Sequence, residues 1–255
     1  MSRQAKPPAA PPQPAEPVGR DALRALILAK AGRIVADEGL AAVQARRLAA
    51  EGNCAVGTLY NIFGDRDGLI LAVNRETMAA LGRPLEIARK AAANGALETR
   101  LLALALAYTS FALENRNRWL AVFEFRLPDD AALPADFEAE RARLLSLLEE
   151  TIGADVASAA QRRIAARALF GAAHGILHLA VNNRLSDFDA GAVEREIRFI
   201  VKAAAAGMLT RACSRIARLK GRSANACTLE RPDIARSGSD RPPMSPTASH
   251  RDAPR

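Results

Sequence analysis

Aromatic residues, cysteine and histidine are all scarce in this chain of 255 residues. Aromatic residues make up 4% of the sequence, and there are three cysteines and three histidines. An apolar share of 49%, rich in alanine and poor in aromatic residues, favours helix over sheet. Cys54, Cys213 and Cys227 lack metal-ligand spacing and do not form an even set, which favours a reduced, cytoplasmic setting.

Long hydrophobic runs and a hydrophobic leader are also missing. No apolar run reaches the roughly 18 residues that a membrane span needs. The N-terminal residues contain no apolar stretch of the kind found in a secretory signal. We therefore expect neither a membrane segment nor export, and the length allows one large or two small domains.

The net charge of +8 is concentrated at the two ends of the chain. Residues 21–210 hold 23 basic and 23 acidic residues, so the high pI is weak evidence for nucleic-acid binding. We expect the Pro/Ala-rich residues 1–19 and the basic, Pro/Ser-rich residues 212–255 to be disordered. The basic residues of the tail either attract DNA nonspecifically or only keep that end soluble. They include Arg211, Arg215, Arg218, Lys220 and Arg222.

Apolar residues recur at helical spacing along the rest of the chain, and no stretch has the alternation of a strand. Asp21 is the expected cap of the first helix, and Gly82-Arg83-Pro84 is expected to end the helix that starts at Arg66. The expected helices cover residues 21–38, 66–81, 97–115, 118–127, 134–152, 155–184 and 191–210. The expected inward residues include Leu23, Leu26, Ile27, Ala31, Ile34, Val35, Phe137, Leu144, Leu145, Leu148, Val193, Ile197, Ile200, Ala204 and Met208.

Residues 43–73 predict two further short helices, a sharp turn between them, and the start of a third helix. Leu48 and Ala49 face inward on the first, which ends at Gly52-Asn53 because Asn tolerates the left-handed backbone conformation. The second runs from about Ala55 to Phe63, and Asp65 caps the helix after it. Two helices joined in this way form a helix-turn-helix, whose second helix can lie in the DNA major groove.

Several short motifs in residues 21–73 occur together in one known family. They are Gly39-Leu40, Leu48-Ala49, the run from Val56 to Phe63, and Asp65-Arg66-Asp67-Gly68-Leu69. In these residues the chain resembles the TetR-type family of bacterial transcriptional repressors, and Ala172-Ala173-His174-Gly175-Ile176 is similar to a motif in the regulatory domain of one subgroup.

The resemblance implies an all-α homodimer that is not an enzyme and needs no cofactor. It implies a three-helix, helix-turn-helix DNA-binding domain over residues 20–83, with a linking helix at 66–82. A larger helical-bundle domain over residues 84–211 would bind a small effector and dimerise through its last two helices.

Three positions depart from the family pattern. Gln44 stands where a Ser or Thr usually caps the first helix of the motif, and Ala55 stands where Ser caps the recognition helix. Gly52-Asn53 replaces the usual Ala-Gly turn. Each lost cap costs about 1 kcal/mol, and each missing hydroxyl removes a candidate phosphate contact.

DNA binding requires phosphate contacts that position the protein and base contacts that select the sequence. Arg46, Arg47 and Arg66 are the expected phosphate ligands, and Tyr60 can add its hydroxyl. The alternative for the first two arginines is an ordinary solvated face. Base contacts are expected from the second helix, where a Thr can touch a thymine methyl and an Asn can pair with adenine. The full set of predicted DNA-binding residues is Gln44, Arg46, Arg47, Ala55, Val56, Gly57, Thr58, Tyr60, Asn61 and Arg66.

His174 and His178 lie four residues apart on one predicted helix, a spacing that can ligate zinc. No third ligand is evident, and no Glu follows His174 as in metalloprotease helices. We therefore expect no metal and place both histidines at an apolar effector cavity or in the core. The predicted effector-binding residues, for which ordinary core packing is the alternative, are Tyr108, Phe111, Trp119, Phe123, Phe170, His174 and His178.

The sequence as a whole predicts a cytoplasmic, ligand-responsive transcriptional regulator. We expect it to act as a repressor that leaves a palindromic double-stranded DNA operator when a small-molecule effector binds. The alternatives are a helical metal-dependent enzyme that uses His174 and His178, and a helical adaptor that binds only protein. Activation in place of repression also fits the sequence.

Overall fold

The computed structural model describes residues 19–128, 132–156, 158–184 and 189–219. Within these ranges the chain is helical and contains no strand, which confirms the predicted all-α class. The described residues up to Ala212 form one compact unit. The helices are α1 Arg20–Glu38, α2 Ala45–Glu51, α3 Val56–Phe63, α4 Arg66–Ala91, α5 Leu97–Glu114, α6 Arg116–Glu124, α7 Ala135–Ile152, α8 Ala159–Val181 and α9 Ala190–Leu219.

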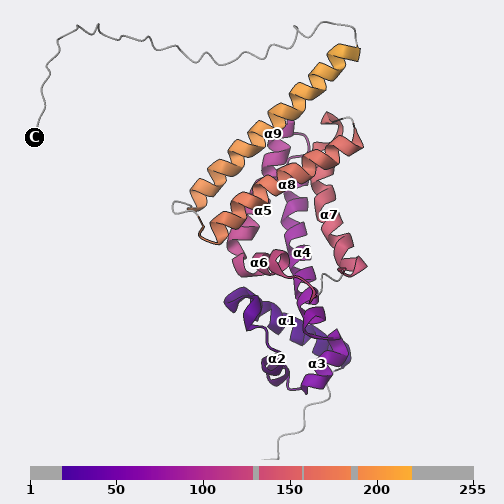
Figure 1. Cartoon of the computed structure of the whole chain (residues 1–255), viewed down its shortest axis with the longest axis vertical. Coiled ribbons are helices and arrows are strands. Elements are labelled where there is room, and N and C mark those ends of the chain that lie inside the picture. The colour runs from indigo at the N-terminus through magenta and orange to yellow at the C-terminus, as the bar shows by residue number, and fades with distance from the viewer. Residues whose placement is uncertain (1–18, 129–131, 157, 185–188, 220–255) are drawn as a thin grey trace, which may run out of the picture. The chain divides into compact units, whose positions relative to one another are not determined.

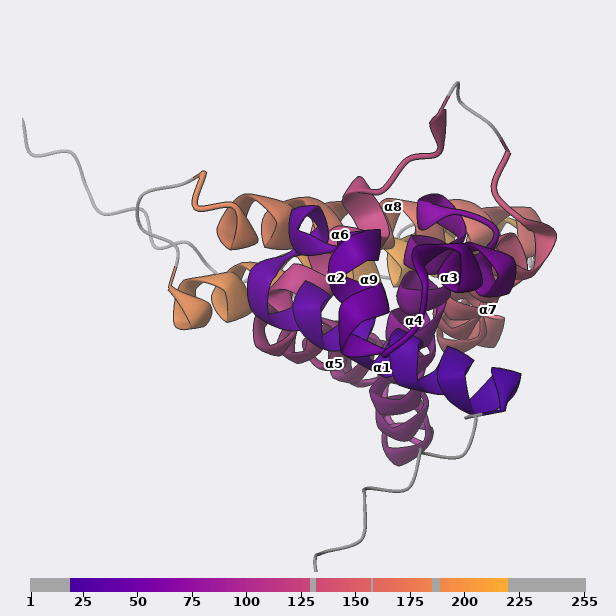
Figure 2. The same ribbon diagram turned by 90° about the horizontal axis from the view of Figure 1, so that it is seen from below.

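The first three helices and the start of α4 enclose a small apolar core of their own. Ile27 of α1, Leu48 of α2 and Leu59 of α3 have no exposed surface, and Leu69 and Val73 of α4 complete the core. Figure 2 looks onto this group of helices from the end of the unit at which α1, α2 and α3 lie. The three-helix unit expected from the sequence is therefore present.

A second and larger apolar core lies among α4 to α9 (Figure 1). Leu101 of α5, Leu177 of α8 and Ile197 of α9 are fully buried in it. α9 contributes a stripe at four-residue steps, formed by Val193, Ile197, Val201 and Ala205. This stripe is rotated slightly from the predicted one, because Ile200, Ala204 and Met208 are only partly buried.

α4 belongs to both cores because it does not stop where the sequence suggested. We expected Gly82-Arg83-Pro84 to end this helix, but it continues through Pro84 to Ala91. A proline removes one backbone donor and disfavours a helix interior. Leu81 and Leu85 on either side of it are nevertheless buried in the larger core, and this packing outweighs the local cost.

Several other helix ends differ from the prediction. Gly19, and not Asp21, occupies the cap position of α1, and Asp21 lies in the first turn, where its charge favours the helix dipole. Leu26 of α1 is 39% exposed and is not part of the core. α6 ends at Glu124, and α8 is shorter than predicted.

α9 extends past the predicted end of the last helix. It continues to Leu219, so the expected disorder is wrong for residues 212–219. The remaining tail and the N-terminal segment, residues 220–255 and 1–18, lie outside the described residues.

α8 is long and apolar enough to cross a membrane by length and composition alone. The core helix of a soluble protein passes the same test, so the finding is weak evidence for a span. α8 packs against α5 and α7, and its residues Leu169, Ala173 and Leu177 are buried in the larger core. These contacts are those of a core helix.

Candidate nucleic-acid interface and ligand cavity

α2 and α3 form the helix-turn-helix that the sequence predicts. The turn between them contains Asn53 with φ +49°, the left-handed conformation expected for this residue. Leu48 and Ala49 of α2 and Leu59 of α3 face the small core, with at most 3% of each exposed. The opposite side of α3 is thereby left at the surface.

Helix caps in this region match the sequence prediction. Gln44 and Ala55 occupy the cap positions of α2 and α3, and neither side chain makes a capping hydrogen bond. Asp65 does cap α4, because its Oδ1 accepts a hydrogen bond of 2.7 Å from the backbone N–H of Gly68. The junction between α3 and α4 turns through Gly64 at φ +85°, a conformation that favours glycine.

The predicted base-reading residues all reach the surface. Asn61 is exposed, and Val56 and Thr58 are half-buried; Tyr60, a predicted phosphate contact, is 40% exposed. Gly57 is exposed, and a Cβ atom added there would meet no atom within 4 Å. α3 therefore presents a face on which a duplex can be placed without moving the protein core.

The predicted phosphate ligands differ in how far they are already engaged with the protein. Arg47 forms ion pairs with Glu38 at 2.7 Å and with Glu51 at 3.1 Å. The hydrogen bond from the Arg47 guanidinium is the main cause of a lowered pKa for the Glu38 carboxyl. Arg46 is exposed and has no ion-pair or hydrogen-bond partner among the described residues.

Arg66 is also engaged at the start of α4. Its Nε donates a hydrogen bond of 3.3 Å to the carbonyl oxygen of Val43, and its guanidinium lies 3.9 Å from the Asp67 carboxylate. Two of the three predicted phosphate ligands thus have protein partners, whereas Arg46 keeps its full hydrogen-bonding capacity for another molecule.

Two basic residues of α1 that the sequence prediction did not include lie against α3. Arg20 donates a hydrogen bond of 2.8 Å to the carbonyl oxygen of Asn61, and the guanidinium of Arg24 lies 5.4 Å from the centre of the Phe63 ring. They place positive charge beside the end of α3. No local motif marks them, because both contacts join residues about forty positions apart in the sequence.

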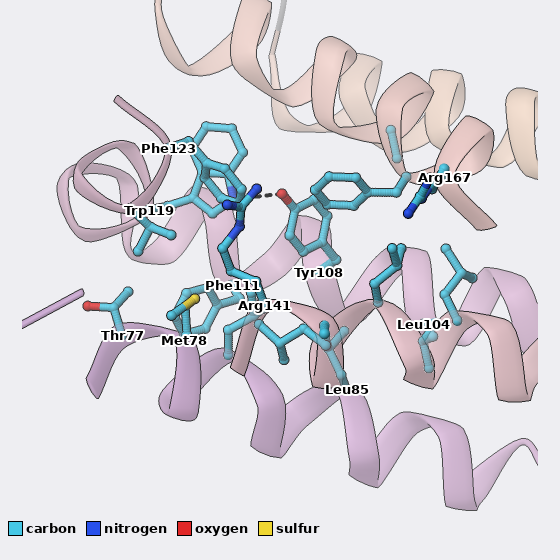
Figure 3. A pocket seen from close by; sticks show the side chains of 18 of the residues that line it. Thr77, Met78, Leu85, Leu104, Tyr108, Phe111, Trp119, Phe123, Arg141 and Arg167 are labelled. Carbon is cyan, nitrogen blue, oxygen red and sulfur yellow. Dashed lines mark hydrogen bonds between the residues drawn. The ribbon is translucent and has the colours of Figure 1, made fainter. Parts of the chain in front are cut away.

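A cavity of about 510 Å³ opens in the larger core (Figure 3). Its volume lies within the range of about 300–1,000 Å³ that is usual for small-molecule sites. Five predicted effector-binding residues line it: Tyr108, Phe111, Trp119, Phe123 and Phe170. α4, α5, α6, α7 and α8 all contribute to the wall, which includes Met78, Leu81, Leu85, Leu104, Leu144, Leu145 and Leu148.

The cavity explains why part of α7 is less buried than predicted. Phe137 is fully packed, but Leu144, Leu145 and Leu148 are only partly buried. These leucines face the cavity, so their exposed surface is surface that a ligand can cover.

His174 and His178 do not line the cavity but lie behind its aromatic wall. The ring centre of His174 is 4.4 Å from that of Phe123 and 4.8 Å from that of Trp119. His178 lies within 5.9 Å of His174, ring to ring. Of the two positions expected for the histidines, the cavity wall and the core, the structure favours the core, where both pack against residues that line the cavity.

A short hydrogen-bond chain joins the aromatic wall to His174. Trp119 Nε1 donates to the Tyr108 hydroxyl at 3.1 Å, and that hydroxyl lies 3.0 Å from His174 Nδ1. Burial raises the pKa of Tyr108, and burial followed by the nearby His178 lowers the pKa of His174 to about 4. Neutral His174 therefore accepts a hydrogen bond from the Tyr108 hydroxyl at Nδ1 and carries its own proton on Nε2.

Zinc ligation by the histidine pair finds no support in the part of the chain that the structure describes. No group of three or more His, Cys, Asp or Glu residues is placed there to hold a metal ion. His174 Nδ1 faces Tyr108, and His178 Nε2 lies 3.3 Å from the Asn182 amide. These two ring nitrogens are engaged within the protein, whereas His178 Nδ1 is buried without a hydrogen-bond partner in the same part of the chain.

Two family models match the chain, one over each core. The model described as bacterial regulatory proteins, tetR family, matches residues 27–73. The model described as a tetracyclin repressor-like C-terminal domain matches residues 101–204. The matched ranges together cover more than half of the chain. No curated protein matches the sequence.

Several solved structures have the same fold. A protein of unknown function from Rhodococcus sp. RHA1 is 24% identical, with a TM-score of 0.58, over 78% of this chain and 97% of its own. A TetR-family transcriptional regulator from Streptomyces coelicolor is 21% identical, with a TM-score of 0.53, over 73% and 96%. A TetR-like transcriptional regulator from Rhodococcus sp. RHA1 is 17% identical, with a TM-score of 0.52, over 75% and 100%. At these identities the likeness concerns the fold.

Proposed function

We propose that this chain, which belongs to the TetR family of bacterial transcriptional regulators, is a cytoplasmic homodimeric repressor that releases its operator when a small molecule fills the cavity. Membership of the family makes it a DNA-binding transcription factor and not an enzyme. The repressor action, the dimer and the response to a ligand are the proposed properties.

The exposed face of α3 supports the assignment of DNA contacts. Thr58 and Asn61 offer hydrogen-bonding groups of the kind that read base edges, and Tyr60 and Arg46 offer groups for phosphates. In a symmetric dimer, two such helices fit successive major grooves when they lie about 34–36 Å apart, or a multiple of that distance.

Exposed apolar side chains on the last two helices support the homodimer. Ile164 and Leu179 of α8 are 68% and 41% exposed, and Phe199 of α9 is 75% exposed. Large apolar groups left exposed on these two helices cost free energy in water, and such surface commonly marks a protein interface. We propose that α8 and α9 of two copies cover these residues.

The observation that carries the ligand response is the double role of α6. Trp119 and Phe123 of this helix line the cavity, whereas Ala121 between them is buried in the core of the DNA-binding domain. Asn117 of α6 also donates a hydrogen bond of 2.9 Å to the carbonyl oxygen of Ala36 at the end of α1. A ligand that moves α6 thus changes the position of the DNA-binding domain.

α4 provides a second connection between the cavity and the DNA-binding domain. Its residues Met78 and Leu81 line the cavity, and Leu69 and Val73 of the same helix lie in the small core. A ligand that fits only one arrangement of α4 and α6 shifts the population toward that arrangement. The spacing of the two recognition helices then no longer matches the operator.

The test is operator binding by the purified full-length protein. Fluorescence anisotropy with DNA from upstream of its own gene should show specific binding, and the double substitution Thr58→Ala and Tyr60→Ala should abolish it without changing the oligomeric state. Thr99→Ala, at an exposed position of α5, is the matched control. Unchanged operator affinity in the double variant would contradict the assignment of α3.

A further inference from the structure

The deep part of the cavity offers a ligand almost no free polar group. Its wall there consists of leucine, methionine and aromatic side chains from α4, α5 and α6 together with Thr77, whose hydroxyl already donates to the carbonyl oxygen of Val73 and accepts from Arg118 Nε. Tyr108 likewise accepts a hydrogen bond from Trp119 and donates one to His174. A polar ligand group placed there would lose water without gaining a partner, so the body of the ligand must be apolar.

Charged residues lie along the rim of the same cavity, and positive charge predominates among them. Arg126, Arg141 and Arg167 line the cavity together with one acidic residue, Glu138. All four side chains belong to exposed residues, so they meet the cavity where it opens to solvent. In the view of Figure 3, Arg141 lies beside the aromatic group and Arg167 lies on the side of Leu104.

Most of this positive charge is not balanced by the protein. Arg141 pairs with Glu138 at 2.8 Å, one turn away on α7. Arg126 and Arg167 have no ion-pair or hydrogen-bond partner among the described residues. The rim therefore keeps two guanidinium groups in excess of its carboxylates. Guanidinium forks match the geometry of a carboxylate and can bind it through two parallel hydrogen bonds.

We propose that the effector is an amphipathic organic anion, with an apolar body among the leucines and aromatic rings and a carboxylate held at the rim by Arg126 and Arg167. This proposal rests on the proposed function, because it names the class of molecule that fills the cavity. An apolar cation of the same length would meet the excess guanidinium groups and be rejected by charge. A neutral alcohol would bury the same apolar surface but gain no charged contact.

The single tryptophan of the chain provides a direct readout of the cavity. Trp119 lines it, and there is no other tryptophan in the sequence, so intrinsic fluorescence reports on this site alone. The full-length protein is titrated with decanoate, decanol and decyltrimethylammonium, below the concentrations at which they form micelles. We expect decanoate to bind at least about tenfold more tightly than the cation, with the alcohol between them.

Substitutions at the rim test the role of the two arginines. Arg167→Gln and Arg126→Gln should each weaken decanoate binding by about tenfold and leave decanol binding nearly unchanged. Arg163→Gln removes the same charge from α8 at an exposed position that does not line the cavity, and it should leave both affinities as they are. Circular dichroism and thermal unfolding establish that each variant is folded.

The outcomes separate this proposal from the proposed function. Tighter binding of the cation, or equal loss of decanoate affinity in the Arg163→Gln control, overturns the anion assignment. Absence of binding by all three probes overturns it as well. The anisotropy measurement with operator DNA is independent of these titrations. If a cationic or neutral ligand releases the DNA, the proposal of a ligand-responsive repressor still holds. If no cavity-bound ligand changes the operator complex, the repressor mechanism itself is overturned.

Discussion

The side-chain amide of Asn74 on α4 donates a hydrogen bond of 2.8 Å to the main-chain carbonyl oxygen of Ala121 on α6. Asn74 has no exposed surface, and 2% of Ala121 is exposed, so the bond is shielded from water. Ala121 lies between Trp119 and Phe123, which line the cavity, and packs in the core that supports the helix-turn-helix. One buried contact thus ties α6, which lines the cavity, to α4, which also contributes to the core of the DNA-binding domain.

Replacing Asn74 with Ala should lower the free energy of unfolding by about 1–3 kcal/mol, because the carbonyl oxygen of Ala121 would stay buried without a partner. Urea denaturation followed by circular dichroism measures the change. Asn94→Ala, at an exposed turn position, is the control and should stay within about 0.5 kcal/mol of the native protein. Equal stability of the two variants would show that the buried bond contributes nothing.

Two glycines near the recognition helix should respond in opposite ways to alanine. A Cβ atom at Gly68 would lie 2.1 Å from the carbonyl oxygen of Phe63, so the backbone would have to move. We expect Gly68→Ala to destabilise the protein by more than about 1 kcal/mol. Gly57→Ala meets no protein atom and should be neutral or slightly stabilising, since alanine is the better helix former.

Gly57→Ala, the more stable of these two variants, should be the one that loses operator affinity through a direct clash if α3 lies against DNA. The added methyl group of Gly57→Ala would occupy space between the helix and the duplex and weaken operator affinity. Thermal unfolding and fluorescence anisotropy, measured on the same preparations, compare the stability and the operator affinity of each variant. A Gly57→Ala variant with full operator affinity would mean that this face of α3 does not approach DNA closely.

Arg46 and Arg47 should contribute unequally to DNA binding although they are neighbours. Arg47 is held by Glu38 and Glu51, whereas Arg46 has no protein partner among the described residues. Loss of one phosphate contact reduces the slope of log affinity against log salt concentration by about 1. We expect this reduction for Arg46→Ala and a smaller one for Arg47→Ala, measured by anisotropy over a salt series. The reverse order would show that Arg47 leaves its carboxylates when DNA binds.

An acidic residue at the exposed face of α8 or α9 should break the homodimer. Ile164→Glu and Phe199→Glu would place a charge in the proposed interface, where it would be buried without a partner. Ile87 of α4 is 69% exposed, nearly the same as Ile164 at 68%, so Ile87→Glu is a matched control. Light scattering coupled to size-exclusion chromatography should give monomers for the first two variants and dimers for the control. Dimers in all three would place the interface elsewhere.

Acidification should destabilise the protein through His174. Its pKa is lowered to about 4 by burial, and an unfolded histidine titrates near 6.5. Between these values the unfolded chain binds a proton that the folded chain does not, so stability falls as the pH falls from about 6.5 toward 4 and is unaffected above that range. His174→Gln cannot take up the proton, and its urea midpoint should fall less between about pH 7 and 5. Parallel losses in both proteins would exclude His174 as the cause.

Local signals in the sequence were sufficient for the helical class and for the helix-turn-helix. The inward position of Leu48, the break at Gly52-Asn53 and the cap at Asp65 all depend on a few neighbouring residues, and each has the predicted role. The same locality explains the wrong end of α4. Pro84 is a local signal for a break, but burial of Leu81 and Leu85 by distant helices outweighs it.

The sequence by itself determined which residues are available for recognition: a surface helix from Val56 to Phe63 and a set of aromatic side chains for an apolar site. Tertiary structure decided how they are used. It engaged Arg47 with Glu38, turned His174 away from the cavity toward Tyr108, and brought Arg141 and Arg167 from different helices to one rim. Helical periodicity depends on neighbours within a few positions, whereas pairing and cavity shape depend on residues brought together only by folding.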